Sequence, residues 1–446
     1  MELACSPMLR QRQGRLSAKL VTLAWAALAL AGCVSEGPSE TPRVGHPWNV
    51  LAELPEGTAL PYLSSDRETL ALSYVAEAGD TAGHRLLRLF GGYDQELARG
   101  GDWFVNWADI PKAELLRGGG LYAHVLARSG AGTYDYSALY DYRPARAERI
   151  TDGRGGETAA RLHEHDGPGE HGFVSWLELP GDSVLAVWLD GRATAAATGE
   201  GAEGHAGHDD HHGEGGAMQL RARALRGGRP VGEELLVDAR VCDCCPTELV
   251  ATANGPMVVY RDRSDGGEVR DLYRAFPLRP GVPPAPVRVD AWEMPGCPVN
   301  GPAAAASPDG RRVLAIGYTA AGGDGAEAAG PRLWAALSED GGLNFGAAEL
   351  LDGALPLGRA DATVLPDGRF AVVYLGGASR TGRAPLVYAE LDGATVSARE
   401  VVDSVSASRA SGIPRVAVDP IGRAVVVAFT RVDTAGQTRV VVRERG

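Results

Sequence analysis

The 446-residue sequence is poor in charge, in aromatic residues and in long apolar runs. Only 23% of its residues are charged and 6% are aromatic, which excludes a coiled coil with long solvated helices. Basic residues are the minority, 44 Lys and Arg against 57 Asp and Glu, so the formal net charge is −13. Because nucleic-acid binding requires a basic surface, we expect no nucleic-acid partner. Apolar residues still make up 44%, enough to bury a core and to exclude wholesale disorder.

One marked apolar run, Leu20–Leu30, follows a basic segment and ends just before Cys33. It is too short to span a bilayer comfortably and fits the apolar region of a secretory signal. The sequence Leu30-Ala-Gly-Cys33 resembles a bacterial lipobox, in which the cysteine is lipidated; the alternative is a soluble signal peptide cut elsewhere. The resemblance predicts a signal peptide over residues 1–32, lipidation of Cys33 and a tether over residues 33–54. It implies an extracytoplasmic protein of the cell envelope, held at the membrane by lipid, and at the outer membrane in a Gram-negative host.

Glycine, by contrast, is abundant, and a repeat accounts for many of the 60 glycines. Each unit has a short apolar run, a turn containing glycine, and a second apolar run that ends in an aromatic residue. The units end at Trp188, Tyr260, Tyr318, Tyr374 and Phe429, and weaker copies end at Tyr74 and Tyr122. The intervals between the last five aromatic residues are 72, 58, 56 and 55 residues. A period near 55 residues with several short strands per unit predicts an all-β, six- or seven-bladed β-propeller over residues 55–446.

The two ends of this repeat region are expected to meet. The last repeat leaves room for only about three strands before Gly446, one fewer than a complete propeller blade. We therefore expect a strand from around residues 46–52 to complete that blade and close the ring.

The segment Ser338-Glu-Asp-Gly-Gly-Leu-Asn-Phe345 matches the Asp-box turn, Ser-x-Asp-x-Gly-x-x-aromatic. With this turn and its repeats, the chain resembles the bacterial sialidase-like proteins with Asp-box (BNR) repeats, over roughly residues 55–446. The resemblance implies six blades, whereas seven aromatic-ended strands are counted here. Family sialidases use an arginine triad for the substrate carboxylate, a Tyr nucleophile activated by Glu, and an Asp acid/base. Their N-terminal Arg-Ile-Pro segment is missing from this chain, and no Tyr–Glu pair stands out at a matching position.

Position within the repeat sorts the reactive residues onto one face. In a propeller, the loops entering the innermost strands and the loops following the second strands open on the same face near the axis, where sites usually form. By this rule the face carries six candidate catalytic residues, namely Asp109, Asp262, Arg263, Arg192, Arg359 and Arg415. Three further residues are candidates for ligand contact on the same face, namely His171, Asp190 and Arg261. Arg and Asp of Tyr260-Arg-Asp-Arg263 have an alternative role in ion pairs that lock neighbouring blades.

Four cysteines remain after the predicted leader is set aside, namely Cys242, Cys244, Cys245 and Cys297. The repeat places them in the entry loops of adjacent blades, close enough to be bridged. Three interpretations stay open: one or two structural disulfides, a thiolate site for Cu(I) or Zn, or a redox-active pair. Three cysteines within four positions cannot all pair locally without strain, which keeps the metal interpretation open.

A Gly-rich insertion over residues 193–216 carries four of the ten histidines within eight positions, namely His205, His208, His211 and His212. Imidazole at this density binds Zn, Cu or Ni weakly in almost any conformation. The segment is therefore either a solvated loop with incidental metal affinity or a loop that delivers metal to the cysteines.

Three functions remain compatible with the sequence. The first is a lipid-anchored propeller that binds a glycan or small-molecule ligand on its Cys/Asp/Arg-lined face, with copper or zinc as the expected metal if one is bound. The second is an exo-α-sialidase-type glycoside hydrolase, so whether the chain is an enzyme stays open. The third is a scaffold for proteins of the envelope.

Overall fold

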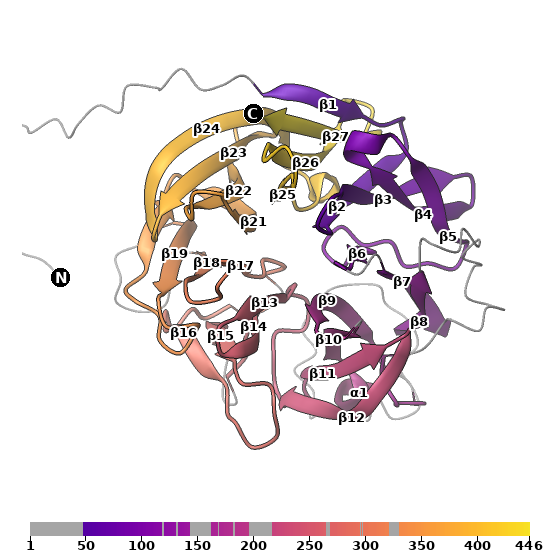
Figure 1. Cartoon of the computed structure of the whole chain (residues 1–446), viewed down its shortest axis with the longest axis vertical. Helices are drawn as coiled ribbons and strands as arrows, with labels where there is room; N and C mark the ends of the chain where they lie inside the picture. Colours follow the sequence, from indigo (N-terminus) through magenta and orange to yellow (C-terminus); the bar gives the residue numbers. More distant parts are fainter. Residues whose placement is uncertain are drawn as a thin grey trace, which may run out of the picture. The chain divides into compact units, whose positions relative to one another are not determined.

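The computed structural model describes residues 48–117, 120–130, 133–142, 162–167, 169–181, 183–195, 216–264, 268–294, 296, 298–320 and 330–446. They all belong to one compact unit, His46–Gly446. Their strands form six four-stranded sheets and one three-stranded sheet, all with antiparallel neighbours. Figure 1 shows the sheets arranged around a common centre, each with its first strand innermost. The fold is an all-β propeller of seven blades.

The first four blades follow the chain from the centre of the ring outward. Blade 1 contains β2 (Thr58–Ser65), β3 (Leu70–Ala78), β4 (Thr81–Arg88) and β5 (Asp94–Gly100). Blade 2 contains β6 (Ala113–Leu115), β7 (Leu121–Gly130) and β8 (Thr133–Tyr142). Blade 3 contains β9 (His171–Leu179), β10 (Ser183–Asp190), β11 (Gln219–Arg226) and β12 (Arg229–Asp238). Blade 4 contains β13 (Glu248–Thr252), β14 (Gly255–Arg261), β15 (Leu272–Ala275) and β16 (Ala285–Arg288).

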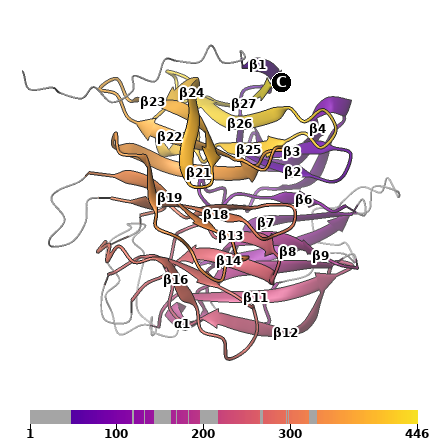
Figure 2. The ribbon, with the colours of Figure 1, turned by 60° about the vertical axis from the view of Figure 1, so that its left-hand side comes forward.

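The last three blades complete the ring. Blade 5 contains β17 (Ala303–Ala306), β18 (Val313–Thr319), β19 (Arg332–Ser338) and β20 (Glu349–Asp352). Blade 6 contains β21 (Pro356–Val364), β22 (Phe370–Gly377), β23 (Arg383–Asp392) and β24 (Thr395–Ser406), and it lies across the ring from blade 3 in both ribbon views (Figures 1 and 2). Blade 7 contains β25 (Arg415–Val418), β26 (Val425–Val432) and β27 (Thr438–Arg445). The described helices are short, namely η1 (Leu89–Gly91), α1 (Arg192–Ala195) and η3 (Arg409–Ser411).

The N-terminal strand closes the ring, as the sequence predicts. β1 (Asn49–Glu53) pairs antiparallel with β27 and becomes the fourth strand of blade 7. Beyond the strand, the N–H of Leu54 donates to the carbonyl of Val440, which continues the pairing towards blade 1. The propeller thus begins within the segment that the sequence assigns to a tether.

The core lies between the blades. Each pair of neighbouring blades encloses an apolar cluster, and the second strand of each blade is buried against both neighbours. This burial on two faces explains why the second strands read as continuous apolar runs, as in Ser183–Asp190, where every residue is buried. The seven repeat-ending aromatic residues all lie in second strands, one per blade, namely Tyr74, Tyr122, Trp188, Tyr260, Tyr318, Tyr374 and Phe429. The described residues thus form seven sheets, one for each aromatic-ended strand, where the sialidase resemblance implies six.

The Asp-box segment forms a compact turn between β19 and β20. The carboxylate of Asp340 accepts hydrogen bonds from the hydroxyl of Ser338 at 2.8 Å and from the backbone N–H of Asn344 at 2.9 Å. These bonds, with that from the Asn344 side chain, hold the pKa of Asp340 down at about 2. The turn lies on the outer part of blade 5 and contributes no residue to the pocket described below.

A search of the described residues for a membrane-crossing helix finds none of sufficient length and apolarity.

Candidate ligand-binding site

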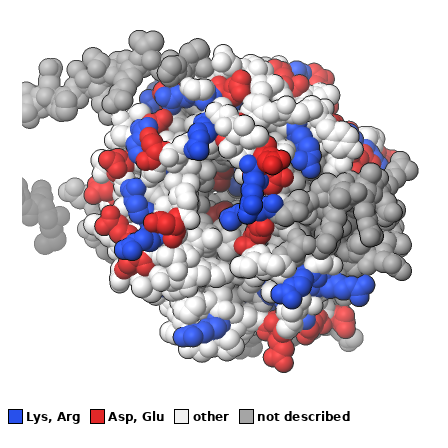
Figure 3. Space-filling model, viewed as in Figure 1, with Lys and Arg blue, Asp and Glu red and all other residues white. Residues whose placement is uncertain are grey.

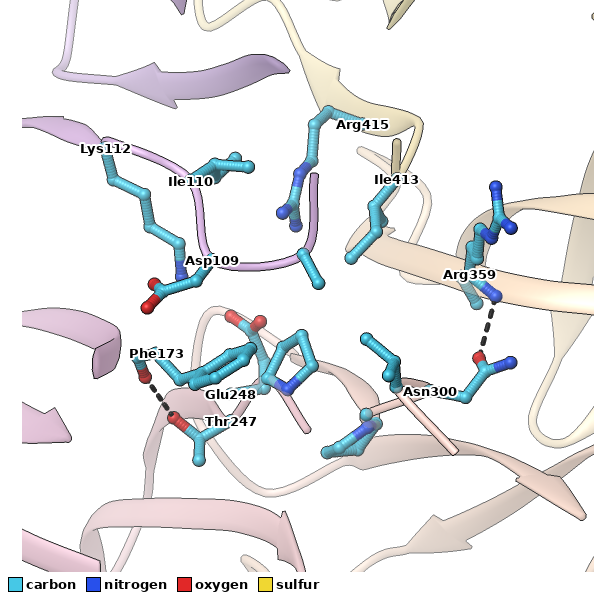
Figure 4. Close-up of a pocket in the computed structure, with 16 residues that line it drawn as sticks. Asp109, Ile110, Lys112, Phe173, Thr247, Glu248, Asn300, Arg359, Ile413 and Arg415 are labelled. Atoms are coloured by element: carbon cyan, nitrogen blue, oxygen red, sulfur yellow. Dashed lines mark hydrogen bonds between the residues drawn. The ribbon is translucent and has the colours of Figure 1, made fainter. Parts of the chain in front are cut away.

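A pocket lies at the centre of the ring, where the entry loops of blades 2 to 7 converge. Figure 3 shows this face hollowed near its centre, with basic and acidic side chains beside the hollow. The hollow measures about 470 Å³, including the part open to solvent. Its lining comprises Ala108, Asp109, Ile110, Lys112, Phe173, Pro246, Thr247, Glu248, Val299, Asn300, Gly301, Pro302, Arg359, Ala360, Ile413 and Arg415 (Figure 4).

A repeated backbone irregularity shapes the inner strands. β2, β9 and β21 each carry a β-bulge, and the residue at each bulge has a left-handed backbone: Leu60 with φ 58°, Phe173 with φ 56° and Arg359 with φ 55°. A non-glycine residue rarely adopts this conformation, and bulges redirect side chains at functional sites. Phe173 and Arg359 line the pocket, so the irregularity turns the strand ends towards it.

Asn300 and Gly301 lock the entry loop of blade 5 to both of its neighbours. The side chain of Asn300 accepts a hydrogen bond of 2.9 Å from the N–H of Arg359 and donates one of 2.9 Å to the carbonyl of Leu357, both on blade 6. Gly301 packs so closely on blade 4 that a Cβ atom would lie 2.2 Å from the carbonyl oxygen of Pro246. Only glycine fits there, which explains the Asn-Gly ending of the Gly296–Gly301 segment.

Charged side chains that are buried or half-buried surround the pocket. Glu248 begins β13, and burial raises its pKa to about 7, against the opposing charge of Lys112. Lys112 donates a hydrogen bond of 2.7 Å to the carbonyl of Val174, and burial lowers its pKa. Burial likewise raises the pKa of Asp361, which accepts a hydrogen bond from the N–H of Val416. Because these groups share one low-dielectric space, the charge of any one depends on its neighbours and on any bound ligand.

Arg415 is a cation of the pocket lining with unused hydrogen-bonding capacity. It is 6% exposed, and its Nε is buried without a hydrogen-bond acceptor among the described residues. Its Nη1 lies 3.6 Å from Oδ1 of Asp361, an ion pair too long for a hydrogen bond. Figure 4 shows its guanidinium pointing into the pocket from the β25 side.

A Tyr–Glu pair lies beside this group. The hydroxyl of Tyr62 on β2 donates a hydrogen bond of 2.8 Å to Oε2 of Glu114 on β6. The guanidinium of Arg415 and the ammonium of Lys112 each lie 5.6 Å from the centre of the Tyr62 ring. Burial raises the pKa of Glu114 to about 7, although the bond from Tyr62 opposes the shift. No such pair stands out in the sequence, because the two residues lie on different blades and outside the entry loops.

Arg359 contributes a second basic group at the rim. Its guanidinium lies 4.6 Å from the centre of the Trp107 ring, and that of Arg409 lies 6.0 Å from the same ring. Burial, together with the like charge of Arg409, lowers the pKa of Arg359 to about 10. Its Nη1 donates to the carbonyl of Ser408 at 2.8 Å.

The structure brings only some of the predicted residues together. Asp109, Arg359 and Arg415, all from entry loops or first strands, line the pocket. The residues that follow second strands do not line it, namely Asp190, Arg192, Arg261, Asp262 and Arg263. His171, at the start of β9, does not line it either. The pocket is thus lined from the entry loops and first strands, whereas Asp190, Arg192, Arg261 and Arg263 of the second set make side-chain contacts within or between blades.

Two arginines of that second set form ion pairs. Arg192 donates two hydrogen bonds to the carboxylate of the buried Asp190, at 2.7 and 2.6 Å, and also pairs with Glu234 at 2.8 Å. Arg263 pairs with Asp243 and Glu268, each at 3.2 Å. Arg263 is therefore ion-paired, but with residues of the entry loop and the β14–β15 connection of its own blade 4, so these pairs do not lock neighbouring blades.

Arg261 and Asp262 instead join neighbouring segments. The guanidinium of Arg261 is buried and donates to the carbonyls of Arg270, Asn300 and Tyr318, which ties blade 4 to blade 5. The N–H of Asp262 donates to the carbonyl of Asp271 at 3.0 Å.

His171 belongs to a cluster of imidazoles in blade 3. Its ring stacks on that of His163, with ring centres 3.7 Å apart, and the ring of His165 lies 5.6 Å from it. Nε2 of His171 lies 3.5 Å from the carboxylate of Asp190. Burial and the neighbouring His171 lower the pKa of His165.

Three of the predicted sulfur ligands come together in the entry loop of blade 4. The sulfur atoms of Cys242, Cys244 and Cys245 lie within 4.8 Å of one another. Cys242 and Cys245 are free, with their sulfurs 3.0 Å apart, whereas Cys244 is disulfide-bonded. Burial opposes ionisation of Cys242, but contact with Cys245 and the charge of Arg270 bring its pKa down to about 7, while burial raises that of Cys245.

The remaining predicted residues lie outside the described part of the chain, namely Cys33, Cys297, His205, His208, His211 and His212.

The sequence-derived candidates do not include Lys112, Glu114, Glu248 and Asp361. Lys112 directly precedes β6, and the other three lie in innermost strands, close to the entry loops from which the candidates come. A usable signal was present, because an ionisable residue within the apolar first run of a repeat unit must either face the channel or be paired.

No protein-family model and no curated protein matches the sequence. Among solved structures, a protein of unknown function from Dyadobacter fermentans is similar with a TM-score of 0.43 and 13% identity, over 87% of this chain and 95% of that chain. The NanB sialidase from Streptococcus pneumoniae is similar with a TM-score of 0.41 and 11% identity, over 84% of this chain and 83% of that chain. The GH93 α-L-arabinofuranosidase of Fusarium graminearum is similar with a TM-score of 0.44 and 10% identity, over 88% of this chain and 98% of that chain. The similar structures thus include sialidases and other glycoside hydrolases, and the likeness concerns the fold.

Proposed function

We propose that this protein binds a small ligand carrying a carboxylate in the pocket at the centre of its propeller. The observation that carries the proposal is Arg415, a buried guanidinium at the pocket whose Nε has no acceptor among the described residues. Buried polar groups are almost always hydrogen-bonded, so an unused donor at a pocket calls for a partner. A carboxylate is the anion that fits a guanidinium best, through two parallel hydrogen bonds.

The rest of the lining supports an anion with additional polar groups. Lys112 and Arg359 add positive charge, and Lys112 has further N–H donors beyond the one bonded to Val174. Asp109 and the carboxyl of Glu248 offer acceptors for ligand hydroxyl groups. An acidic sugar carries both kinds of group, a carboxylate for Arg415 and hydroxyls for the acids.

Calorimetric titration of the purified protein with N-acetylneuraminate and glucuronate, and with neutral N-acetylglucosamine, tests the proposal. We expect the acidic sugars to bind and the neutral one to bind more weakly. Arg415→Gln should weaken binding of the acid by about tenfold or more, the size of a lost charge-assisted hydrogen bond. Arg439→Gln is the matched control, because Arg439 pairs with Glu53 and Glu56 at the surface. Equal affinity for neutral and acidic sugars, or binding unaffected by Arg415→Gln, contradicts the proposal.

A second candidate function, glycoside hydrolysis of the sialidase type, is favoured by the bond between Tyr62 and Glu114. In such chemistry the Glu carboxylate takes the phenolic proton while the phenolic oxygen attacks the sugar, and a carboxyl with a pKa near 7 suits a general base. Turnover of a fluorogenic sialoside tests it. Tyr62→Phe and Glu114→Gln should abolish turnover while leaving ligand affinity within a few-fold of the parent. Absence of turnover in the parent protein rules this candidate out.

We further propose that lipid on Cys33 anchors the protein to the extracytoplasmic face of a membrane, which rests on the sequence Leu30-Ala-Gly-Cys33. Metabolic labelling with a fatty-acid analogue in a bacterial host should label the protein and not its Cys33→Ser variant. Equal labelling of both would contradict the anchor.

A further inference from the structure

Two thiols lie buried side by side behind the wall of the pocket. Cys242 and Cys245 are 1% and 2% exposed, and their sulfur atoms are 3.0 Å apart. The residues that follow them in the chain, Pro246 to Glu248, line the pocket, whereas the cysteines do not. The thiol pair is therefore separate from the anion-binding pocket.

A buried guanidinium adjoins these thiols. Arg261 is 2% exposed, its guanidinium donates to carbonyl oxygens and lies 4.7 Å from the centre of the Trp292 ring, and no carboxylate of the described residues forms an ion pair with it. Its own backbone carbonyl accepts a hydrogen bond of 3.0 Å from the N–H of Cys242. The N–H of Asn300, whose carbonyl receives the guanidinium, donates to the sulfur of Cys245. A buried cation needs a nearby negative charge, and the sulfur pair is the group in position to supply it.

We propose that Cys242 and Cys245 bind one soft monovalent metal ion, Cu(I), and that Arg261 balances the charge of the complex. Thiolates select soft ions such as Cu(I) over harder ones. Two thiolates and one monovalent ion carry one net negative charge, which the guanidinium neutralises. The same thiolates with Zn(II) are neutral, so Arg261 stays uncompensated, and Arg270 adds a second positive charge beside Cys242. Zn(II) sites also use four ligands, whereas this pair supplies two.

Cys244 is excluded from the metal site because its sulfur is disulfide-bonded. A disulfide between Cys242 and Cys245 is the competing arrangement for these two sulfurs. It is electrically neutral and leaves Arg261 without a counter-charge, which is why the metal complex is preferred here. The two arrangements are distinguished directly by experiment.

The test uses protein in which His205, His208, His211 and His212 are replaced by Ala, so that the imidazoles of the insertion do not compete. Free thiols are first counted in the unreduced, denatured protein, and two are expected. Anaerobic titration with Cu(I) against bicinchoninate, and with Ag(I), should then give one ion per chain. Zn(II) at the same concentration should give no stoichiometric binding. A Cys242–Cys245 disulfide found by mass spectrometry, or tight Zn(II) binding, overturns the proposal.

Variants assign the ion to its ligands. Cys242→Ser and Cys245→Ser should each abolish stoichiometric binding, while Arg439→Gln, the surface control, keeps it. Arg261→Lys should retain most of the Cu(I) affinity, and Arg261→Gln should lose about tenfold or more. Thermal unfolding of each variant confirms that it is folded. Binding that survives Cys242→Ser, or an affinity equal in Arg261→Gln and Arg261→Lys, overturns the assignment; either result leaves the pocket proposal untouched.

Discussion

The hydroxyl of Tyr62 donates a hydrogen bond of 2.8 Å to Oε2 of Glu114, which joins the innermost strands of blades 1 and 2. Both side chains are half-buried, so water replaces the bond only partly when it is lost. The pair therefore connects the packing of blades 1 and 2 to the electrostatics of the pocket.

Tyr62→Phe removes the donor and leaves the half-buried carboxyl of Glu114 without this hydrogen bond. We expect the unfolding free energy to fall by about 1–3 kcal/mol, because the carboxyl oxygen is still shielded from water but no longer accepts a hydrogen bond. The bond lowers the pKa of Glu114, so that pKa should rise above about 7 in the variant. The loss should be larger at pH 8, where the carboxylate is charged, than at pH 6. Urea unfolding at both pH values measures it, with the exposed Tyr93→Phe as control. Equal losses at the two pH values contradict the argument.

Asp190→Asn tests the buried ion pair of blade 3. The carboxylate accepts bonds from Arg192 and from the indole N–H of Trp188 at 2.9 Å. Burial acts to raise the pKa of Asp190, but the bonds from Arg192 and Trp188 outweigh it and lower that pKa. A lowered pKa contributes stability that is present above the unfolded-state value and is lost as the pH falls. We expect the variant to lose about 3 kcal/mol at pH 7 and much less near pH 3.

The control for this variant has the same sequence spacing at the surface. Asp367 pairs with Arg369 at 2.7 Å, with the carboxylate side chain half exposed. Asp367→Asn should therefore cost less than about 1 kcal/mol. Urea unfolding of both variants across pH gives the comparison, and similar losses at pH 7 would show that burial of the Asp190 pair is unimportant.

The aromatic ends of the repeats predict the fold well, since a second strand packed between two neighbouring blades is apolar on both faces. Tyr374 and Phe429 show this directly, because each is at most 1% exposed and belongs to clusters shared between blades. The closing strand is predictable for a related reason, because a blade short by one strand leaves an unpaired edge. Asn49–Glu53 supplies that strand.

The site is less predictable, because the position of a residue within the repeat predicts which loop or strand it lies in but not where a long side chain points. Arg192 and Arg263 belong to the loops that the repeat pattern predicts for the site, yet their guanidiniums form ion pairs with nearby carboxylates. Glu248 is the opposite case: it lies within a strand, so its position in the repeat does not mark it as a candidate. Its importance arises from burial among charges contributed by several blades, such as Lys112 and Asp361, which no local pattern records.

Trp48→Ala should weaken the closure of the ring. The indole N–H of Trp48 donates to Glu400 at 3.1 Å, its ring meets the edge of Tyr388 with centres 5.2 Å apart, and its carbonyl accepts from Arg443. Because Trp48 adjoins the strand Asn49–Glu53, these contacts hold that strand in blade 7. For a half-buried aromatic residue we expect a loss of about 1–3 kcal/mol.

Urea unfolding measures this loss, with Tyr93→Ala as an exposed aromatic control expected to change stability by less than about 0.5 kcal/mol. Faster hydrogen exchange in residues 49–53 should accompany the loss. Unchanged exchange there, despite lower stability, would show that Trp48 acts elsewhere.

The pH dependence of ligand affinity follows from Glu248. Its pKa is raised to about 7, so the carboxyl is neutral at pH 6 and negative at pH 8. Ionisation places a negative charge beside Arg415 and Lys112, where it repels a ligand carboxylate, and Glu114, with a pKa also near 7, acts in the same direction. We expect the dissociation constant for an acidic sugar to rise several-fold between pH 6 and pH 8. Glu248→Gln should remove most of this pH dependence of the dissociation constant, while Asp367→Asn should leave it unchanged. Affinity that rises with pH would mean that the ligand binds through the acids of the pocket and that Arg415 is not its anchor.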